Sequence, residues 1–174
     1  MNMMALDIEF NQPSKAIIQI GVAVFNVESG AIIATGRYYI NPNETLNPFI
    51  VDLCGISQEQ VNSGMTVDEA YILIKLMYED YNCDLNLVTW GGGDSDAFKA
   101  AVAPELGWRY GRRWQDAKTL YQAYMLSKGA KVQAGLAKAL TRLGGAFKGR
   151  KHDAMDDAVN TAVIYCKLIK LFKG

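Results

Sequence analysis

The sequence predicts an α/β fold, a mixed sheet with antiparallel N-terminal strands that is flanked by helices. Runs of β-branched and apolar residues fill the first forty positions, whereas an apolar repeat with helical spacing extends from Asp94 almost to the end. Strands followed by helices are typical of a sheet covered by packed helices. The 174 residues are 50% hydrophobic and 21% charged, without a linker, repeat or low-complexity tract. We therefore expect one domain, over residues 1–174.

Three strands are predicted at the N-terminus, over residues 3–10, 16–25 and 31–40. Residues 26–30, NVESG, join the second to the third, and their Ser and Gly suit a hairpin turn. An antiparallel three-stranded start follows. A fourth, buried strand is expected over residues 85–90, LNLVTW, where the apolar run stops at three glycines.

Helices are predicted from capping signals and apolar spacing. Ser57 with Gln60 has the pattern of a capping box, and Thr66 with Glu69 repeats it before a second helix. The apolar positions of that second helix are Ala70, Leu73, Ile74 and Met77. Four further helices are expected over residues 94–103, 116–126, 132–143 and 153–172, and a loop over residues 41–48.

Composition bounds the location and the partners of the protein. The 18 basic residues balance the 18 acidic ones, which argues against a protein that holds nucleic acid by bulk charge but not against a site that brings its own cations. Cys54, Cys83 and Cys166 form no CxxC pair, which is typical of reduced thiols. Neither a signal peptide nor an apolar run long enough to span a membrane is visible, so we expect a cytoplasmic protein.

The first functional motif is Asp7 and Glu9, in LDIEF. A strand places both side chains on one face and Leu6, Ile8 and Phe10 on the other. Two neighbouring acids on a buried strand repel each other and lose hydration unless a cation or a shared proton compensates. A solvated edge strand is the alternative that the pair alone leaves open.

The second motif is GGGDSD, which offers Asp94 and Asp96. Asp94 follows a strand and would open a helix, where the helix dipole favours a negative charge. Ala97, Phe98, Ala101 and Val102 follow at offsets that place Asp94 on the buried side of this helix, so Asp94 is favoured over Asp96. Either acid could instead be the helix N-cap.

The third motif, HDAMDD, opens the last helix and contains His152, the chain's only histidine. Asp153 and Asp156 have the spacing of an N-cap and its third helical position, so we assign them structural roles. Asp157 lies one turn inside, among small residues that allow close approach to a sheet. A lone histidine is usually a surface or satisfied residue, but its place five residues before Asp157 argues for a catalytic role.

In chain order, the strand-borne Asp-x-Glu, the Trp-Gly-x-x-Asp before a helix and the His-x-x-x-x-Asp of the last helix together resemble the DEDDh (DnaQ-like) family of 3′-to-5′ exonucleases. The stretches LCGISQEQVNSGMTVDEA and GLAKALTRLGGAFKGRKHDAMDDAVNTA are most similar to its exoribonuclease-type branch. The resemblance spans nearly the whole chain. It departs from the family at GGGDSD, which is richer in glycine and contains two aspartates.

The resemblance implies a ribonuclease H-like fold with a mixed five-stranded sheet and a single exonuclease domain over residues 1–174. It also implies two divalent ions, Mg²⁺ or Mn²⁺, and a water nucleophile. The implied metal ligands are Asp7, Glu9, Asp94 and Asp157, and His152 is the implied general base, because histidine titrates near neutral pH. The implied reaction is hydrolysis from the 3′ ends of single-stranded nucleic acid, RNA in preference to DNA, which releases nucleoside 5′-monophosphates.

Substrate contacts are predicted beside these acids. The resemblance implies that hydrophobic residues near the first motif, here Ile8 and Phe10, wedge the terminal bases, with a core position as the alternative for Phe10. Arg150 and its basic neighbours Lys148 and Lys151 would hold backbone phosphates, with solvated loop residues as the alternative. A second basic cluster is Arg109, Arg112, Arg113 and Lys118. Two alternatives are a non-catalytic nucleic-acid-binding or regulatory module and an endonuclease of the same fold. A module without catalysis would tolerate a missing acid, and none is missing.

Overall fold

The computed structural model of the chain describes residues 1–84 and 86–173. These residues form a five-stranded sheet in the order β3-β2-β1-β4-β5. The strands are β1 (Asn2–Phe10), β2 (Ile17–Asn26), β3 (Ile32–Tyr39), β4 (Val88–Thr89) and β5 (Gln115–Asp116). β1 and β3 each pair antiparallel with β2, whereas β4 pairs parallel with both β1 and β5. The mixed sheet and its antiparallel start are therefore as predicted.

The two short strands differ from the prediction. β4 has two residues, where the sequence predicts six; Leu85, the first of those six, lies outside the described residues. Asp116, the second residue of β5, was predicted as the first residue of a helix. Asp116 explains this error, because it ends the strand and also caps the next helix through bonds from the backbone N–H groups of Lys118 and Thr119.

The helices are α1 (Pro48–Cys54), α2 (Gln58–Asn62), α3 (Val67–Asp80), α4 (Asp94–Ala101), α5 (Ala117–Ser127), α6 (Leu136–Arg142) and α7 (Ala154–Phe172), with a short 3₁₀ helix at Pro104–Leu106. Both predicted capping boxes are present, at the starts of α2 and α3. α6 is shorter than predicted. None of these helices in the described part of the chain is long and apolar enough to cross a membrane.

α1 was not predicted, although its ends carry recognisable signals. The Asn47 side chain accepts a bond from the backbone N–H of Phe49, Pro48 is the first helical residue, and Gly55 closes the helix with a φ of 66°. Pro48 was expected to end a loop. The helix has only seven residues, too few for a periodic apolar pattern to show.

The buried face of α3 is also turned relative to the prediction. Ala70, Tyr71 and Ile74 are buried as part of the core, whereas Leu73 is 43% exposed. Tyr71 and Leu73 are both apolar and both lie near Ile74 on the helix, so apolar character alone did not tell which side of Ile74 faces the core.

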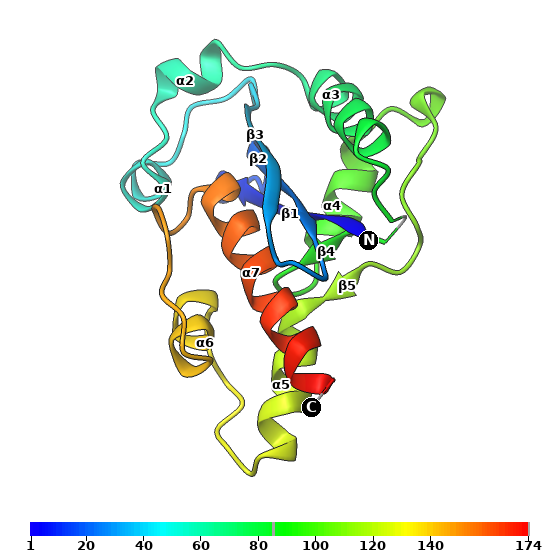
Figure 1. The fold of residues 1–174 in the computed structure, drawn as a ribbon. Coiled ribbons are helices and arrows are strands. Elements are labelled where there is room, and N and C mark those ends of the chain that lie inside the picture. Colours follow the sequence, from blue (N-terminus) through cyan, green and yellow to red (C-terminus); the bar gives the residue numbers. More distant parts are fainter. Residues whose placement is uncertain (85, 174) are drawn as a thin grey trace.

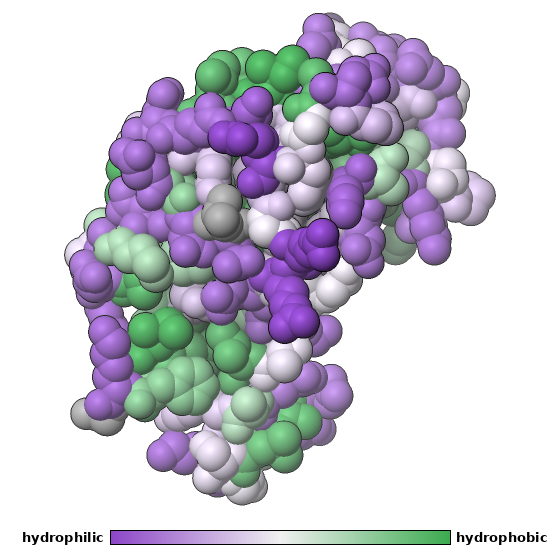
Figure 2. Space-filling model, turned by 90° about the vertical axis from the view of Figure 1, so that its right-hand side faces the viewer, coloured by the Kyte–Doolittle hydropathy of each residue, from purple (hydrophilic) through white to green (hydrophobic). Residues whose placement is uncertain are grey.

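Figure 2 shows that apolar surface on the viewed side is gathered in separate groups divided by hydrophilic surface.

The sheet is covered on both faces, and α7 runs along one of them (Figure 1). Met3, Ala5, Ala23 and Phe25 of β1 and β2 pack against this helix and against α5 and α6. The alternate residues of the same strands, which include Leu6, Ile20 and Val22, pack against α3 and α4. β1 is therefore a central strand, packed on both sides, with its two acidic residues near its C-terminal end.

Gly21 of β2 sets the distance between the sheet and the start of α7. A Cβ added there would lie 2.0 Å from the backbone carbonyl carbon of Ala154, far inside contact distance. Only glycine fits this position without moving the helix.

Replacing Gly21 by alanine should therefore destabilise the fold, by about 3 kcal/mol in the free energy of unfolding measured with urea, because overpacking of this kind displaces backbone. Gly92→Ala is the matched control, since no heavy atom of the described residues lies within 4 Å of its added Cβ. Equal stability of the two variants would contradict the close docking of α7 on β2.

Candidate active site

β1 places Asp7 and Glu9 on the face that α7 covers. They continue the alternation of Met3 and Ala5, whereas Ile8 belongs to the core on the opposite face. Both carboxylates are partly buried. The alternative of a solvated edge strand is wrong, because β1 lies between β2 and β4.

α4 brings Asp94 to this pair. Gly93 is the N-cap, Asp94 is the first helical residue, and Phe98, one turn later, is fully buried and anchors the helix. Neither Asp94 nor Asp96 is therefore the cap. The negative charge of Asp94 raises the pKa values of Asp7 and Glu9, whereas Asp96 is exposed to solvent. The structure thus brings Asp94 to the first motif.

α7 contributes Asp157 from its first turn. As predicted, Asp153 is the N-cap, and its carboxylate accepts a bond from the backbone N–H of Asp156 at 3.1 Å. Asp156 has a structural role as well, because it accepts a 2.7 Å bond from the backbone N–H of Arg150. The carboxylate of Asp157 accepts a 3.2 Å bond from the backbone N–H of His152.

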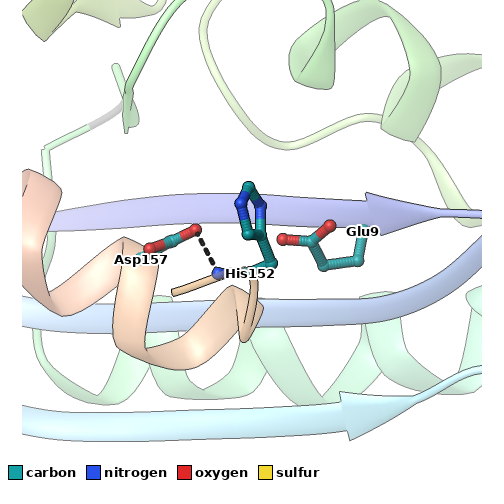
Figure 3. Close-up of side chains that lie close together, drawn as sticks. All are labelled: Glu9, His152 and Asp157. Atoms are coloured by element: carbon teal, nitrogen blue, oxygen red, sulfur yellow. Dashed lines mark hydrogen bonds between the residues drawn. The ribbon is translucent and has the colours of Figure 1, made fainter. Parts of the chain in front are cut away.

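His152 stands at the opening of the site. Its imidazole projects between the carboxylates of Glu9 and Asp157 (Figure 3), and one ligand atom from each of the three residues lies within 4.8 Å of the others. The side chain is exposed, and the backbone is in the left-handed region with a φ of 61°. A residue with a Cβ adopts this conformation only where its surroundings impose it.

Burial shifts the pKa values of all four acids upward, and the charges of neighbouring carboxylates add to the shift at Asp7, Glu9 and Asp157. Burial is the main cause in each case: it raises the pKa of Glu9 and of Asp94 to about 7 and of Asp157 to about 6. The pKa of Asp7 is raised well above its ordinary value, by burial and then by the charges of Asp94, Asp157 and Glu9. Ionised together, these groups need nearby positive charge. A cluster of carboxylate oxygens fits hard divalent cations such as Mg²⁺ or Mn²⁺.

Cys54 is a site neighbour that sequence reasoning missed. Its thiol donates to the Glu9 carboxylate, with a sulfur-to-oxygen distance of 3.3 Å. Burial, followed by the charge of Glu9, raises the pKa of this thiol to about 12. No sequence signal identified the contact, because Cys54 ends the unpredicted helix α1.

Two cavities adjoin the acids. One, of about 300 Å³, is lined by residues that include Lys138, Phe147, Lys151, His152 and Asp157. The other, of about 410 Å³, is lined by residues that include Phe10, Gln12, Lys15, Gly93 and Asp94. The acids are thus reachable from the α6–α7 side and from the α4 side.

The predicted substrate residues have different positions. Phe10 lines the second cavity. Ile8 is 5% exposed and packs in the core opposite the acids, so the structure does not place it beside them, and its contact with a terminal base stays a prediction. Arg150 is exposed, but its guanidinium lies against Gly55 and 3.5 Å from the carbonyl oxygen of Asp52. Its contact with phosphates stays a prediction.

Comparisons with known proteins show which family the chain matches. The family model described as Exonuclease (RNase_T) matches residues 4–165. The 3'-5' exonuclease Snipper of Drosophila melanogaster is 26% identical over 88% of this chain and 61% of its own, and human ERI1 exoribonuclease 2 is 25% identical over 90% and 26%. The chain thus spans less than two thirds of the length of these relatives.

Solved structures share the fold. The nuclease domain of 3'hExo, described as a DEDDh family member bound to rAMP, superposes with a TM-score of 0.80 at 22% identity, over 97% of this chain and 92% of that one. Cell-death related nuclease 4 gives a TM-score of 0.81 at 21% identity, over 98% and 64%. The ribonuclease H-like architecture expected from the sequence is therefore confirmed.

The raised pKa of Asp94 predicts how stability depends on pH in the presence of a chelator. The folded state holds this proton up to about pH 7, whereas an unfolded aspartate releases it near pH 4. The free energy of unfolding should therefore fall as the pH rises from about 4 to about 7. Asp94→Asn removes the charge and should stabilise the protein by about 2 kcal/mol at pH 8 but not at pH 4.

Urea denaturation at both pH values measures this difference, and Asp96→Asn, at an exposed position, is the control that should change neither value. A gain for Asp94→Asn of the same size at pH 4 would show that ionisation is not its cause.

Proposed function

Because this chain belongs to the exonuclease family, we propose that it is a metal-dependent 3′-to-5′ exonuclease acting on single-stranded ends, with RNA favoured over DNA, and releasing nucleoside 5′-monophosphates. The observation that carries the proposal is the meeting of Asp7, Glu9, Asp94 and Asp157 from three elements. The preference for RNA is supported by relatives named exoribonucleases.

These four acids are the proposed ligands of two divalent ions, Mg²⁺ or Mn²⁺. Such ions, when bound, stabilise the attacking and leaving oxygens of a phosphodiester and lower the pKa of water. The protein's contribution is to hold the ligands rigidly. Asp7 and Glu9 are fixed by the pleat of a central strand, and Asp94 and Asp157 by the first turns of two helices.

His152 is the proposed general base. Its imidazole lies at the opening of the site beside Glu9 and Asp157 (Figure 3), where it can accept a proton from a water held among the carboxylates. The bond from its backbone N–H to Asp157 links the base to a proposed metal ligand. The backbone of His152 and the carboxylate of Asp157 would therefore keep a fixed relative position.

The substrate strand is proposed to enter along the cavity between α6 and α7. Lys138 and Lys151 line it and offer charges for phosphates, and Phe147 offers an apolar surface for a base. The terminal nucleoside would then lie toward Phe10 and the second cavity.

We expect the protein to release nucleoside 5′-monophosphates from a single-stranded RNA with a 3′-hydroxyl end when Mg²⁺ is present. Asp7→Asn should lower kcat/KM at least about a hundredfold, because the ligand set loses a charge that serves transition-state stabilisation. Product chromatography on matched RNA and DNA oligonucleotides measures both effects.

Asp96→Asn is the matched control and should retain activity. A circular single strand should stay intact, since cleavage of the circle would favour the endonuclease alternative. Full activity of Asp7→Asn would contradict the proposal, and binding of RNA without hydrolysis would favour the non-catalytic module.

His152→Ala should lower kcat by about 10²–10⁴-fold, the usual contribution of a general base, while Mn²⁺ affinity measured by calorimetry stays within a few-fold of the parent's. General-base catalysis makes kcat depend on pH, and the variant should lose the part of this dependence that His152 supplies. A pH profile identical to the parent's would exclude His152 as the base.

A further inference from the structure

Strands β2 and β3 carry polar groups on the same face as the acids. In the antiparallel register, Asp7 lies opposite Gly21, and Gly21 lies opposite Arg37; the neighbouring row contains Glu9 and Gln19. Residues directly opposite each other share a face of a sheet. Gln19 and Arg37 therefore extend the two rows that begin with the acids of β1.

Arg37 and Gln19 both contact the N-cap residue of α7, Asp153. The Nε and Nη2 groups of Arg37 donate to one carboxylate oxygen of Asp153, at 3.2 and 2.9 Å. The amide nitrogen of Gln19 donates to the other oxygen at 3.3 Å, and its amide oxygen accepts the backbone N–H of Ala154 at 2.7 Å. Gly21, between them, leaves the space that Ala154 occupies.

These contacts are partly shielded from water, although the side chain of Arg37 is 35% exposed. Gln19 is fully buried and the Asp153 side chain is 11% exposed, while the guanidinium of Arg37 closes the network from the solvent side. Charge-assisted bonds in such surroundings are strong and orient their partners. The charge of Asp153 adds to the repulsion that raises the pKa values of Asp7 and Glu9, and Arg37 supplies the opposite charge beside Asp153.

Asp153 immediately follows His152, whose left-handed backbone needs support from its surroundings. On one side, the His152 N–H is held by the carboxylate of Asp157. On the other, Asp153 is held by Arg37 and Gln19. The described contacts thus fix both ends of the turn that presents the imidazole.

We propose that Arg37, together with Gln19, is a positioning residue that fixes the turn at His152 and the start of α7 through Asp153. Its effect on catalysis rests on the proposed function, whereas its effect on the conformation of His152 does not. A purely structural role would alter only the stability of the fold.

The imidazole of His152 provides a direct test, because it belongs to the chain's only histidine and its NMR signals need no assignment. In the metal-free protein, Arg37→Gln should shift or broaden these signals. Arg109→Gln is the matched control: it breaks an exposed 3.3 Å pair with Glu79 of α3, and its spectrum should coincide with the parent's. Urea denaturation verifies that each variant is folded.

In activity assays, Arg37→Gln should lower kcat at least about tenfold with KM within about twofold of the parent's, because an effect on positioning leaves ground-state binding intact. Arg37→Lys should recover part of kcat, since it restores the charge but not the two-pronged contact.

Coincident imidazole signals in folded Arg37→Gln and parent would overturn the proposal, even if activity fell. If Arg37→Gln does not fold, Arg37→Met, which keeps the apolar stem without the charge, replaces it. Shifted or broadened imidazole signals in this variant would support the proposal, and coincident signals would overturn it. An inactive parent would refute the proposed function but leave the NMR comparison as the test of this inference.

Discussion

Mutual repulsion of four carboxylates in a partly buried cleft is the constraint on which the arrangement of this protein depends. Asp7 and Glu9 leave a central strand on the same side, and Asp94 and Asp157 reach them from two helices. Bringing such charges together out of water is unfavourable. The raised pKa values of all four acids express that cost.

The surrounding fold opposes this repulsion with fixed dipoles and with two apolar cores. Asp94 and Asp157 lie in the first turns of α4 and α7, where the helix dipole favours negative charge. The thiol of Cys54 donates to Glu9, and the backbone of His152 donates to Asp157. β1 and β2 are packed on both faces, so the strand that carries Asp7 and Glu9 is held in place against the repulsion.

Periodicity explains how much of this could be predicted from the sequence. The long strands, α7 and both capping boxes follow local rules, and the pleat alone places Asp7 and Glu9 together. The same pleat places Ile8 on the opposite face, so its proposed contact with substrate conflicted with the alternation that predicted the acid pair. By contrast, β4 and β5 have two residues each and α1 has seven, too few for a period to show.

The contacts that hold the site were harder to predict because they depend on register between strands. Gln19 is conspicuous in the apolar run AIIQIGVAVF, but its partner, Asp153, is 134 residues away in the chain. Arg37 lies on the edge strand β3, which carries none of the proposed metal ligands. Only the alignment of Asp7, Gly21 and Arg37 across three strands shows that the edge strand and the acids share one face. The position of Asp157 and His152 relative to Asp7 therefore depends on β2 and β3, so substitutions on those strands can alter the site without touching a ligand.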